Sequence, residues 1–213
     1  MEQLQQLALA VGLSWASGIR LYATVFIVGM LGRLGYVHLP DDLLVLEHTF
    51  VLIASGIMLV VDFLADKIPG FDSLWDSIHT FIRIPIGAML AWGAMGDSTP
   101  AIQLAAGLLG GAITTGTHLA KTGTRAAINT SPEPFSNWTA SFAEDGMFLG
   151  GLWLVFSHPA AFLTLLVVFL ALTIWLLPKI FRFLANLWRR ITGRASGPPP
   201  GAAASSAKQL QGS

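Results

Sequence analysis

The stretch PAAFLTLLVVFLALTIWLLP, residues 159–178, contains no charged side chain. The hydrocarbon core of a bilayer is about 30 Å thick, and a helix needs about 20 mostly apolar residues to cross it. This stretch therefore predicts a transmembrane helix. The whole chain has the same character, because 54% of its 213 residues are hydrophobic and 11% are charged. That charged fraction is less than half of the roughly 25% found in soluble domains.

Five further apolar runs precede this stretch, at about 4–34, 43–65, 84–97, 100–128 and 136–157. The run 84–97 is too short to cross a bilayer alone, so part of 72–83 must join it to complete a span. Whether 72–83 instead forms a re-entrant segment stays open. The sequence predicts an all-α, polytopic helical membrane protein with about six transmembrane helices.

The charges are distributed unevenly along the chain. Residues 1–178 contain all 12 acidic residues and six basic ones, whereas the remaining six basic residues follow from Lys179 onward. Cytoplasmic segments of membrane proteins are enriched in Lys and Arg. We therefore expect the C-terminus in the cytoplasm, and six crossings would place the N-terminus there too. The chain has no cysteine, which excludes disulfides and thiol chemistry.

The sequence predicts three segments. Residues 1–178 form the transmembrane helical domain. Residues 179–194, KIFRFLANLWRRITGR, predict a basic amphipathic helix that lies on the membrane surface, although a last span that continues past the bilayer fits equally well. Residues 195–213 are rich in Pro, Gly and Ser, which is typical of a disordered tail. Membrane lipids are the expected partners, nucleic acid is not, and a homo-oligomer stays open.

Polar residues follow one face of the fourth predicted helix. Because successive helical residues turn by about 100°, His118, Lys121, Arg125 and Asn129 share that face. Cations inside a membrane need a partner or a water-filled cavity. The fifth predicted helix is antiparallel to the fourth and offers two acids.

Those two acids are Glu144 and Asp145, and they are expected to meet Lys121 or His118 at a similar depth. A structural ion-pair network is the alternative to a functional site. We favour a functional site because ionisable groups inside membrane spans usually mark pathways.

Arg20 lies near the middle of the first apolar run. An arginine at such a depth costs roughly 2.5–3.5 kcal/mol on insertion scales. It therefore predicts either a pocket-facing side chain or an ion pair with Asp62, Glu144 or Asp145. The segments SGIRLYAT (17–24) and TGTHLAKT (115–122) also resemble each other, and a degenerate internal repeat would relate Arg20 to His118.

A cluster of acids offers a candidate metal site. Pairs at i and i+4 lie on one helix face, and oxygen ligands suit a divalent cation. An N-cap role for Asp72, or an interfacial ion pair between Asp66 and Lys67, explains the same pattern. The candidate ligands are Asp62, Asp66, Asp72, Asp76 and His79.

Three segments resemble the motifs of the bacterial membrane proteins grouped as domain of unknown function 4126: GIRLYATVFIVGMLGRLG, FLADKIPGFDSLWDSIHTFIRIPIGA and THLAKTGTRAAINTSPEPFSNWTASFAEDG. The resemblance covers about residues 10–155. It implies a multi-pass protein of the bacterial inner membrane without an established activity. It assigns no catalytic residue.

The residues favour a small transporter or channel for a polar or anionic solute. Its binding residues would be Arg20, His118, Lys121, Arg125, Asn129, Glu144 and Asp145. A metal-dependent intramembrane enzyme that acts on a lipid phosphate is the first alternative, although no G-x-S-x-G or H-E-x-x-H motif supports it. A membrane scaffold without transport is the second.

Overall fold

Helices make up the part of the chain that the structure, a computed structural model, describes: residues 2–65, 68, 71–96, 98–130 and 134–191. No strand occurs in these ranges, which confirms the all-α prediction. The elements are α1 (Glu2–Arg33), η1 (Asp41–Glu47), α2 (Thr49–Ala65), α3 (Phe71–Ala94), α4 (Pro100–Ile128), α5 (Pro134–Ser157) and α6 (Pro159–Ile191).

Proline and glycine set several helix ends. Pro100 and Pro159 are the first residues of α4 and α6, where a missing N–H costs nothing. Gly35 ends α1 with a φ of 75°, a conformation that side chains disfavour. The N–H of Tyr36 then donates back to the carbonyl of Leu31 at 2.9 Å, as in a Schellman motif.

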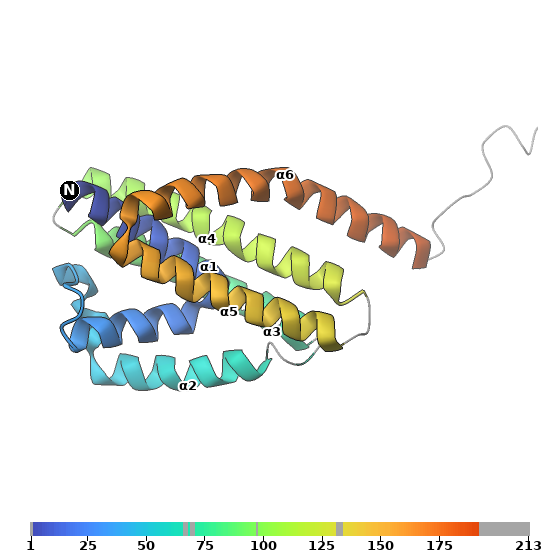
Figure 1. Ribbon diagram of the computed structural model, residues 1–213, viewed down its shortest axis with the longest axis horizontal. Coiled ribbons are helices and arrows are strands. Elements are labelled where there is room, and N and C mark those ends of the chain that lie inside the picture. Colours follow the sequence, from blue (N-terminus) through green and yellow to red (C-terminus); the bar gives the residue numbers. More distant parts are fainter. Residues whose placement is uncertain (1, 66–67, 69–70, 97, 131–133, 192–213) are drawn as a thin grey trace, which may run out of the picture.

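The first helix folds back on itself at Arg20, whose φ of −143° and ψ of 83° are not helical. A straight helix from Glu2 to Arg33 would be about 48 Å long at 1.5 Å per residue. Instead, Gln5 and Val37 line one cavity, so the chain returns to the end from which it started. Figure 1 shows the second half of α1 running back beside α2. The element is therefore a helical hairpin.

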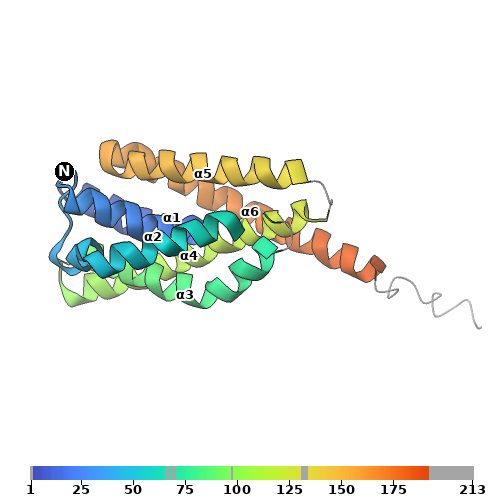
Figure 2. The same ribbon diagram turned by 90° about the horizontal axis from the view of Figure 1, so that it is seen from below.

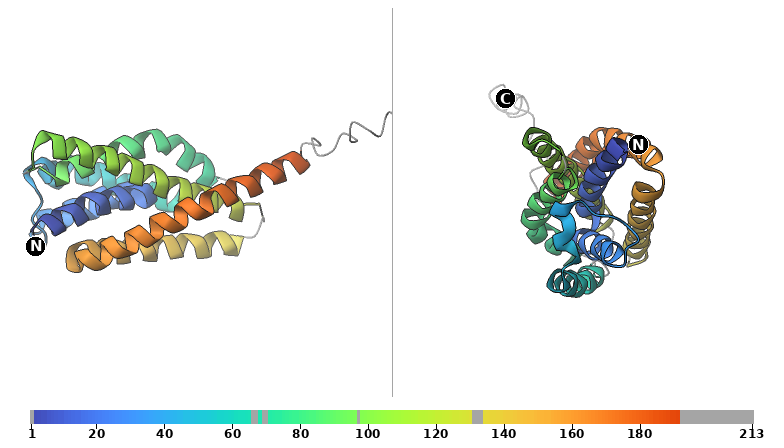
Figure 3. Two further views of the ribbon diagram at one scale, coloured as in Figure 1. Left: turned by 90° about the horizontal axis from the view of Figure 1, so that it is seen from above. Right: turned by 90° about the vertical axis from the view of Figure 1, so that its left-hand side faces the viewer.

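Each half of α1 has its own neighbour. The first half runs parallel to α4, with the carbonyl of Ser14 accepting from the Thr114 hydroxyl at 2.9 Å. A Cβ on Gly18 would lie 2.7 Å from the Cβ of Thr117, so only glycine permits this approach. The second half is antiparallel to α2. These contacts make the hairpin the centre of the bundle, as the end-on view in Figure 3 shows.

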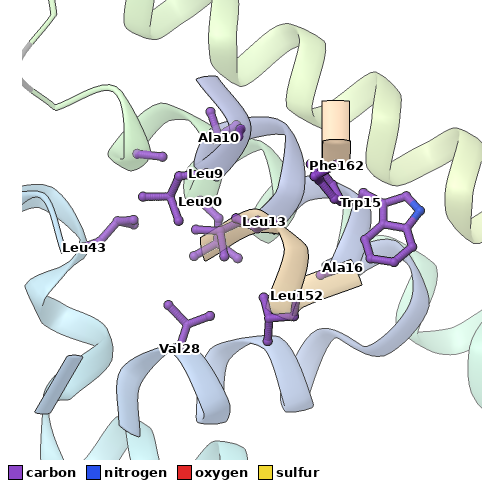
Figure 4. Close-up of a cluster of buried hydrophobic side chains, with 14 of the residues drawn as sticks. Leu9, Ala10, Leu13, Trp15, Ala16, Val28, Leu43, Leu90, Leu152 and Phe162 are labelled. Carbon is purple, nitrogen blue, oxygen red and sulfur yellow. The ribbon is translucent and has the colours of Figure 1, made fainter. Parts of the chain in front are cut away.

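Apolar side chains fill the end of the bundle where the chain begins. Both halves of α1 contribute to this core, together with η1, α3, α5 and α6 (Figure 4). Its members include Leu9, Leu13, Val28, Leu43, Leu90, Leu152 and Phe162, all at most 7% exposed. The charged residues that are buried lie toward the other end, so the bundle has an apolar half and a polar half.

The outer surface is also apolar, with large exposed side chains on α2, α3, α5 and α6. Such surface is costly in water and suits a lipid environment. Two described helices, α1 and α6, are long and apolar enough to cross a membrane, and η1 with α2, bent by 63°, makes a third if counted as one span. This suggests a membrane protein. Six transmembrane helices are not confirmed, and the apolar length of α1 is divided between the two halves of its hairpin.

Two stretches whose assignment the sequence left open belong to continuous helices. Residues 72–83 belong to one continuous helix, α3, which runs through Pro85 to Ala94 and is curved (Figure 2). Likewise, α6 continues through Pro178 to Ile191, so no helix ends at the expected boundary of the transmembrane domain. The predicted disordered tail lies outside the described residues. The start of α1 and the end of α6 lie at opposite ends of the bundle (Figure 1), and the side of the membrane on which each terminus lies stays a prediction.

Candidate functional site

The break in α1 creates the centre of the candidate site. In a continuous helix the carbonyl of Ile19 would accept from the N–H four residues later. At the break it accepts side-chain donors instead: Arg83 Nη1 at 2.8 Å and Lys121 Nζ at 3.3 Å. Cations from α3 and α4 therefore stabilise irregular backbone that would be costly in an apolar environment.

A first group of charges, which we name the inner pairs, joins α2, α3 and α4. Arg83 Nη2 lies 3.0 Å from Asp62 Oδ1 and 2.9 Å from Asp76 Oδ1. Lys121 Nζ lies 3.4 Å from Asp76 Oδ2. The four side chains are at most 2% exposed. Trp75 Nε1 adds a hydrogen bond of 3.0 Å to Asp62 Oδ1. Each buried carboxylate thus has at least two donors, which buried charge requires.

A second group, which we name the α5 pairs, attaches α5 to the rest of the bundle. Arg125 binds Glu144 through two parallel hydrogen bonds of 2.9 Å, the bidentate geometry that gives the strongest arginine–carboxylate contacts. Arg20 forms an ion pair with Asp145. Unlike the inner carboxylates, Glu144 and Asp145 have side chains that are 12% and 23% exposed. The α5 pairs therefore border accessible space.

Arg20 connects the two groups. Its Nη1 lies 3.3 Å from Asp62 Oδ2, while the same guanidinium binds Asp145. The site as a whole contains four cations and four carboxylates, so it is electrically balanced. The cations are Arg20, Arg83, Lys121 and Arg125, and the carboxylates are Asp62, Asp76, Glu144 and Asp145.

Two histidines complete the polar half. His118 Nε2 lies 2.6 Å from the Thr80 hydroxyl. His79 Nδ1 lies 2.8 Å from the carbonyl oxygen of Trp75. The His79 ring packs against the Trp75 indole, with 4.0 Å between the ring centroids. His118 thus faces the other charges from α4, whereas His79 belongs to an aromatic contact on α3.

The structure brings together six of the predicted binding residues but pairs them differently. Glu144 binds Arg125 instead of Lys121 or His118, since the latter two residues turn toward α3. Arg20 meets two of its three predicted partners. Asn129 caps the end of α4, where its N–H donates to the Arg125 carbonyl at 2.8 Å.

The predicted metal ligands are arranged differently. Among the described residues, no group of three or more His, Asp or Glu side chains is placed to hold a metal ion. Asp62 and Asp76 instead accept hydrogen bonds from arginine and lysine. Asp66 and the side chain of Asp72 lie outside the described part of the chain.

Sequence reasoning missed two features of the site. Arg83 is fully buried and binds both inner carboxylates, although it was not among the predicted binding residues. Asp76, Thr80 and Arg83 recur at helical spacing, and this signal would have placed all three on one face of α3. The break at Arg20 had no comparable signal beyond the preceding Gly18.

A cavity of about 150 Å³ adjoins the α5 pairs, between α1, α4, α5 and α6. Most of its lining surface is apolar, and Ile19, Ala120, Met147 and Phe169 line it together with the polar residues Thr117, Lys121, Thr124 and Glu144. The Thr117 hydroxyl is buried and has no hydrogen-bond partner among the residues that the structure describes. An unpaired buried hydroxyl beside a cavity indicates room for a polar guest.

A family model described as "Domain of unknown function (DUF4126)" matches residues 7–179. No curated protein and no solved structure matches the chain.

Proposed function

Because the chain belongs to the domain of unknown function 4126 family, whose description assigns no activity, we propose a function from the site: a membrane transporter of a small anionic solute. The solute binds at the α5 pairs, beside Lys121 and Arg125. Arg20, His118 and Asp145 complete its surroundings, and Asn129 lies at the adjacent helix end.

The observation that carries this proposal is the break of α1 among buried charges. Transporters commonly form their substrate sites at discontinuous helices, where freed backbone groups meet charged side chains. In this chain the freed carbonyl of Ile19 meets Lys121 and Arg83. A scaffold needs neither a broken helix nor a cavity beside it, so both features favour transport.

The α5 pairs contain the carboxylate that a solute anion can replace. Glu144 occupies the anion-binding fork of Arg125 and is partly exposed, so an incoming anion can displace it. The inner carboxylates are closed from solvent and already have two or more donors each. We therefore assign solute binding to the α5 pairs together with Lys121, which lines the cavity, and structural support to Asp62, Asp76 and Arg83.

Charge balance adds a coupled proton. The site holds equal numbers of cations and carboxylates, and an added anion would leave one uncompensated charge in a low-dielectric interior. Protonation of one carboxylate restores neutrality. We propose that each solute anion crosses together with one proton, so that transport is electroneutral.

We propose a multi-pass orientation in which the C-terminal end of α6 faces the cytoplasm, since it carries Lys179, Arg182, Arg189 and Arg190. With the hairpin of α1 counted as two passes, Glu2 would then face the opposite side. The bacterial inner membrane, which the resemblance implies, remains a prediction.

Cysteine labelling tests the orientation in this cysteine-free chain. The variants Gln3→Cys, Ser98→Cys and Ser196→Cys are exposed to a membrane-impermeant maleimide in intact cells. The first two should react from outside and the third only after permeabilisation. Equal labelling of Gln3→Cys and Ser196→Cys from one side would contradict the hairpin orientation.

Flux into vesicles tests the transport. The purified chain is reconstituted into liposomes that contain a pH-sensitive dye, and an inward gradient of methanesulfonate, nitrate or phosphate is applied. Anion entry with a proton should acidify the interior at least about tenfold faster than in protein-free liposomes. Such acidification should be lost in Lys121→Met, which removes the cation beside the cavity.

The matched control is Arg33→Met, because Arg33 donates to Thr49 at an exposed position far from the site. This variant should acidify the vesicles at the wild-type rate. If no anion of the panel acidifies vesicles above the protein-free rate, the transport proposal fails and a purely structural network remains.

A further inference from the structure

We propose that the transported solute is a single-chain amphiphilic anion, with its charged head beside Lys121 and its apolar chain in a groove along α5. This inference rests on the proposed transport function and names its substrate class. Two adjoining spaces carry it, one beside the α5 pairs and one beyond.

The first space is the cavity of about 150 Å³ already described, which we name the head cavity. The Thr117 side chain is 1% exposed, and its hydroxyl has no partner. A buried hydroxyl without a partner is unfavourable unless a guest accepts its hydrogen bond. An anionic head accepts a hydrogen bond from this hydroxyl and is attracted by Lys121, so the cavity favours an acceptor.

The second space, which we name the tail groove, has a volume of about 350 Å³ between α1, α5 and α6. Its lining is apolar, and three glycines on α5 keep it open. A Cβ added to Gly146 or Gly150 would meet no atom within 4 Å. The other lining residues are Trp15, Leu154, Phe162, Leu165 and Leu166, with Gly151.

The two spaces share Met147 and Phe169 as lining residues, so they adjoin each other at these side chains. Along α5 the lining extends from Glu144 to Leu154, which is about 15 Å at 1.5 Å per residue. A guest that fills both spaces must be polar at one end and apolar along several carbons. A small inorganic anion would use the head cavity alone.

The tail groove opens on the outer side of the bundle, because Gly146 and Gly150 are exposed. In a membrane this side faces lipid, so an amphiphile can enter laterally with its head directed at the charges. A chain of a bilayer lipid fits the groove by its apolar lining alone. Such a lipid does not account for the head cavity, because the lipid headgroup remains at the membrane interface.

The test compares linear alkanesulfonates in the dye-loaded liposomes, because sulfonates stay ionised at neutral pH and do not carry protons through lipid themselves. Each additional buried methylene strengthens binding by about fourfold. We therefore expect hexanesulfonate to half-saturate acidification at a concentration at least about tenfold below that of methanesulfonate.

Two glycine variants separate the tail groove from general effects. Gly150→Leu adds an apolar side chain at the groove, where a Cβ meets no atom within 4 Å, whereas Gly116→Leu adds the same side chain on α4, where a Cβ is equally free but lies outside both spaces. Gly150→Leu should remove the advantage of hexanesulfonate and preserve methanesulfonate flux. Gly116→Leu should change neither, and Thr117→Val should weaken both sulfonates.

The outcomes distinguish this inference from the proposed function. Equal half-saturation for both sulfonates, or an unchanged advantage in Gly150→Leu, overturns the amphiphile assignment and leaves anion transport in place. The first result would mean that a bilayer lipid or nothing fills the tail groove. Acidification by no sulfonate and no other anion overturns both proposals together.

Discussion

The inner pairs and the α5 pairs use the same chemistry in different surroundings. Asp62 and Asp76 are at most 1% exposed and bind cations that also stabilise the break in α1. Glu144 and Asp145 are partly exposed and attach a helix that presents three glycines to an open groove. Burial, more than the type of pair, separates a structural role from an exchangeable one.

The difference has an energetic basis. Removing one partner of a buried ion pair leaves an uncompensated charge in a medium of low dielectric constant, at a cost of about 3–5 kcal/mol. A partly exposed carboxylate regains water when its partner leaves, so its release costs less. The following variants test this comparison by measuring stability and flux side by side.

The largest effect is expected for Arg83→Met. This variant removes one donor from Asp62, one from Asp76 and one from the Ile19 carbonyl. The free energy of unfolding should therefore fall by about 3–5 kcal/mol. The measurement is thermal unfolding of detergent-solubilised protein, followed by size-exclusion chromatography. A melting temperature equal to that of wild type would contradict the structural role of the inner pairs.

A smaller stability effect and a large flux effect are expected for Glu144→Gln. The amide preserves the shape of the side chain but removes the negative charge that binds Arg125. Stability should fall by about 1–3 kcal/mol, while anion flux should fall at least about tenfold. Glu144→Asp, which keeps the charge, should recover part of the flux, and unchanged flux in Glu144→Gln would refute exchange at this pair.

A double variant, Arg125→Met with Glu144→Met, should separate the effect on stability from the effect on anion flux. Replacement of a whole ion pair by apolar side chains is often neutral for stability, whereas loss of one partner is not. We expect unfolding within about 1 kcal/mol of wild type, together with complete loss of flux. Wild-type flux in this variant would show that the pair only joins helices.

The smallest effect is expected for Thr80→Val, which removes the 2.6 Å contact with His118 Nε2. One buried hydrogen bond contributes about 1 kcal/mol to stability. The melting temperature should therefore fall slightly, while Thr139→Val, at an exposed position on α5, should leave it unchanged. A shift as large as that of Arg83→Met would mean that His118 belongs to the inner network.

Much of this arrangement could be predicted from the sequence, because composition and helical spacing are local properties. The all-α class and the polar face of α4 follow from such patterns, and the family followed from the resemblance of three sequence motifs. The hairpin could not be predicted, since its stability comes from Arg83 and Lys121, which follow the Ile19 carbonyl by 64 and 102 residues. Ion-pair partners on five elements depend equally on packing, so the partner of Glu144 was predicted incorrectly.

The hairpin in α1 also has a consequence for biosynthesis. During translation Arg20 enters the membrane 42 residues before Asp62, its first carboxylate partner along the chain. Until then its charge is unbalanced, and the Ile19 carbonyl has neither Arg83 nor Lys121 as a donor. The break in α1 therefore gains its side-chain donors only after α3 and α4 have been synthesised, so the hairpin is completed late in folding.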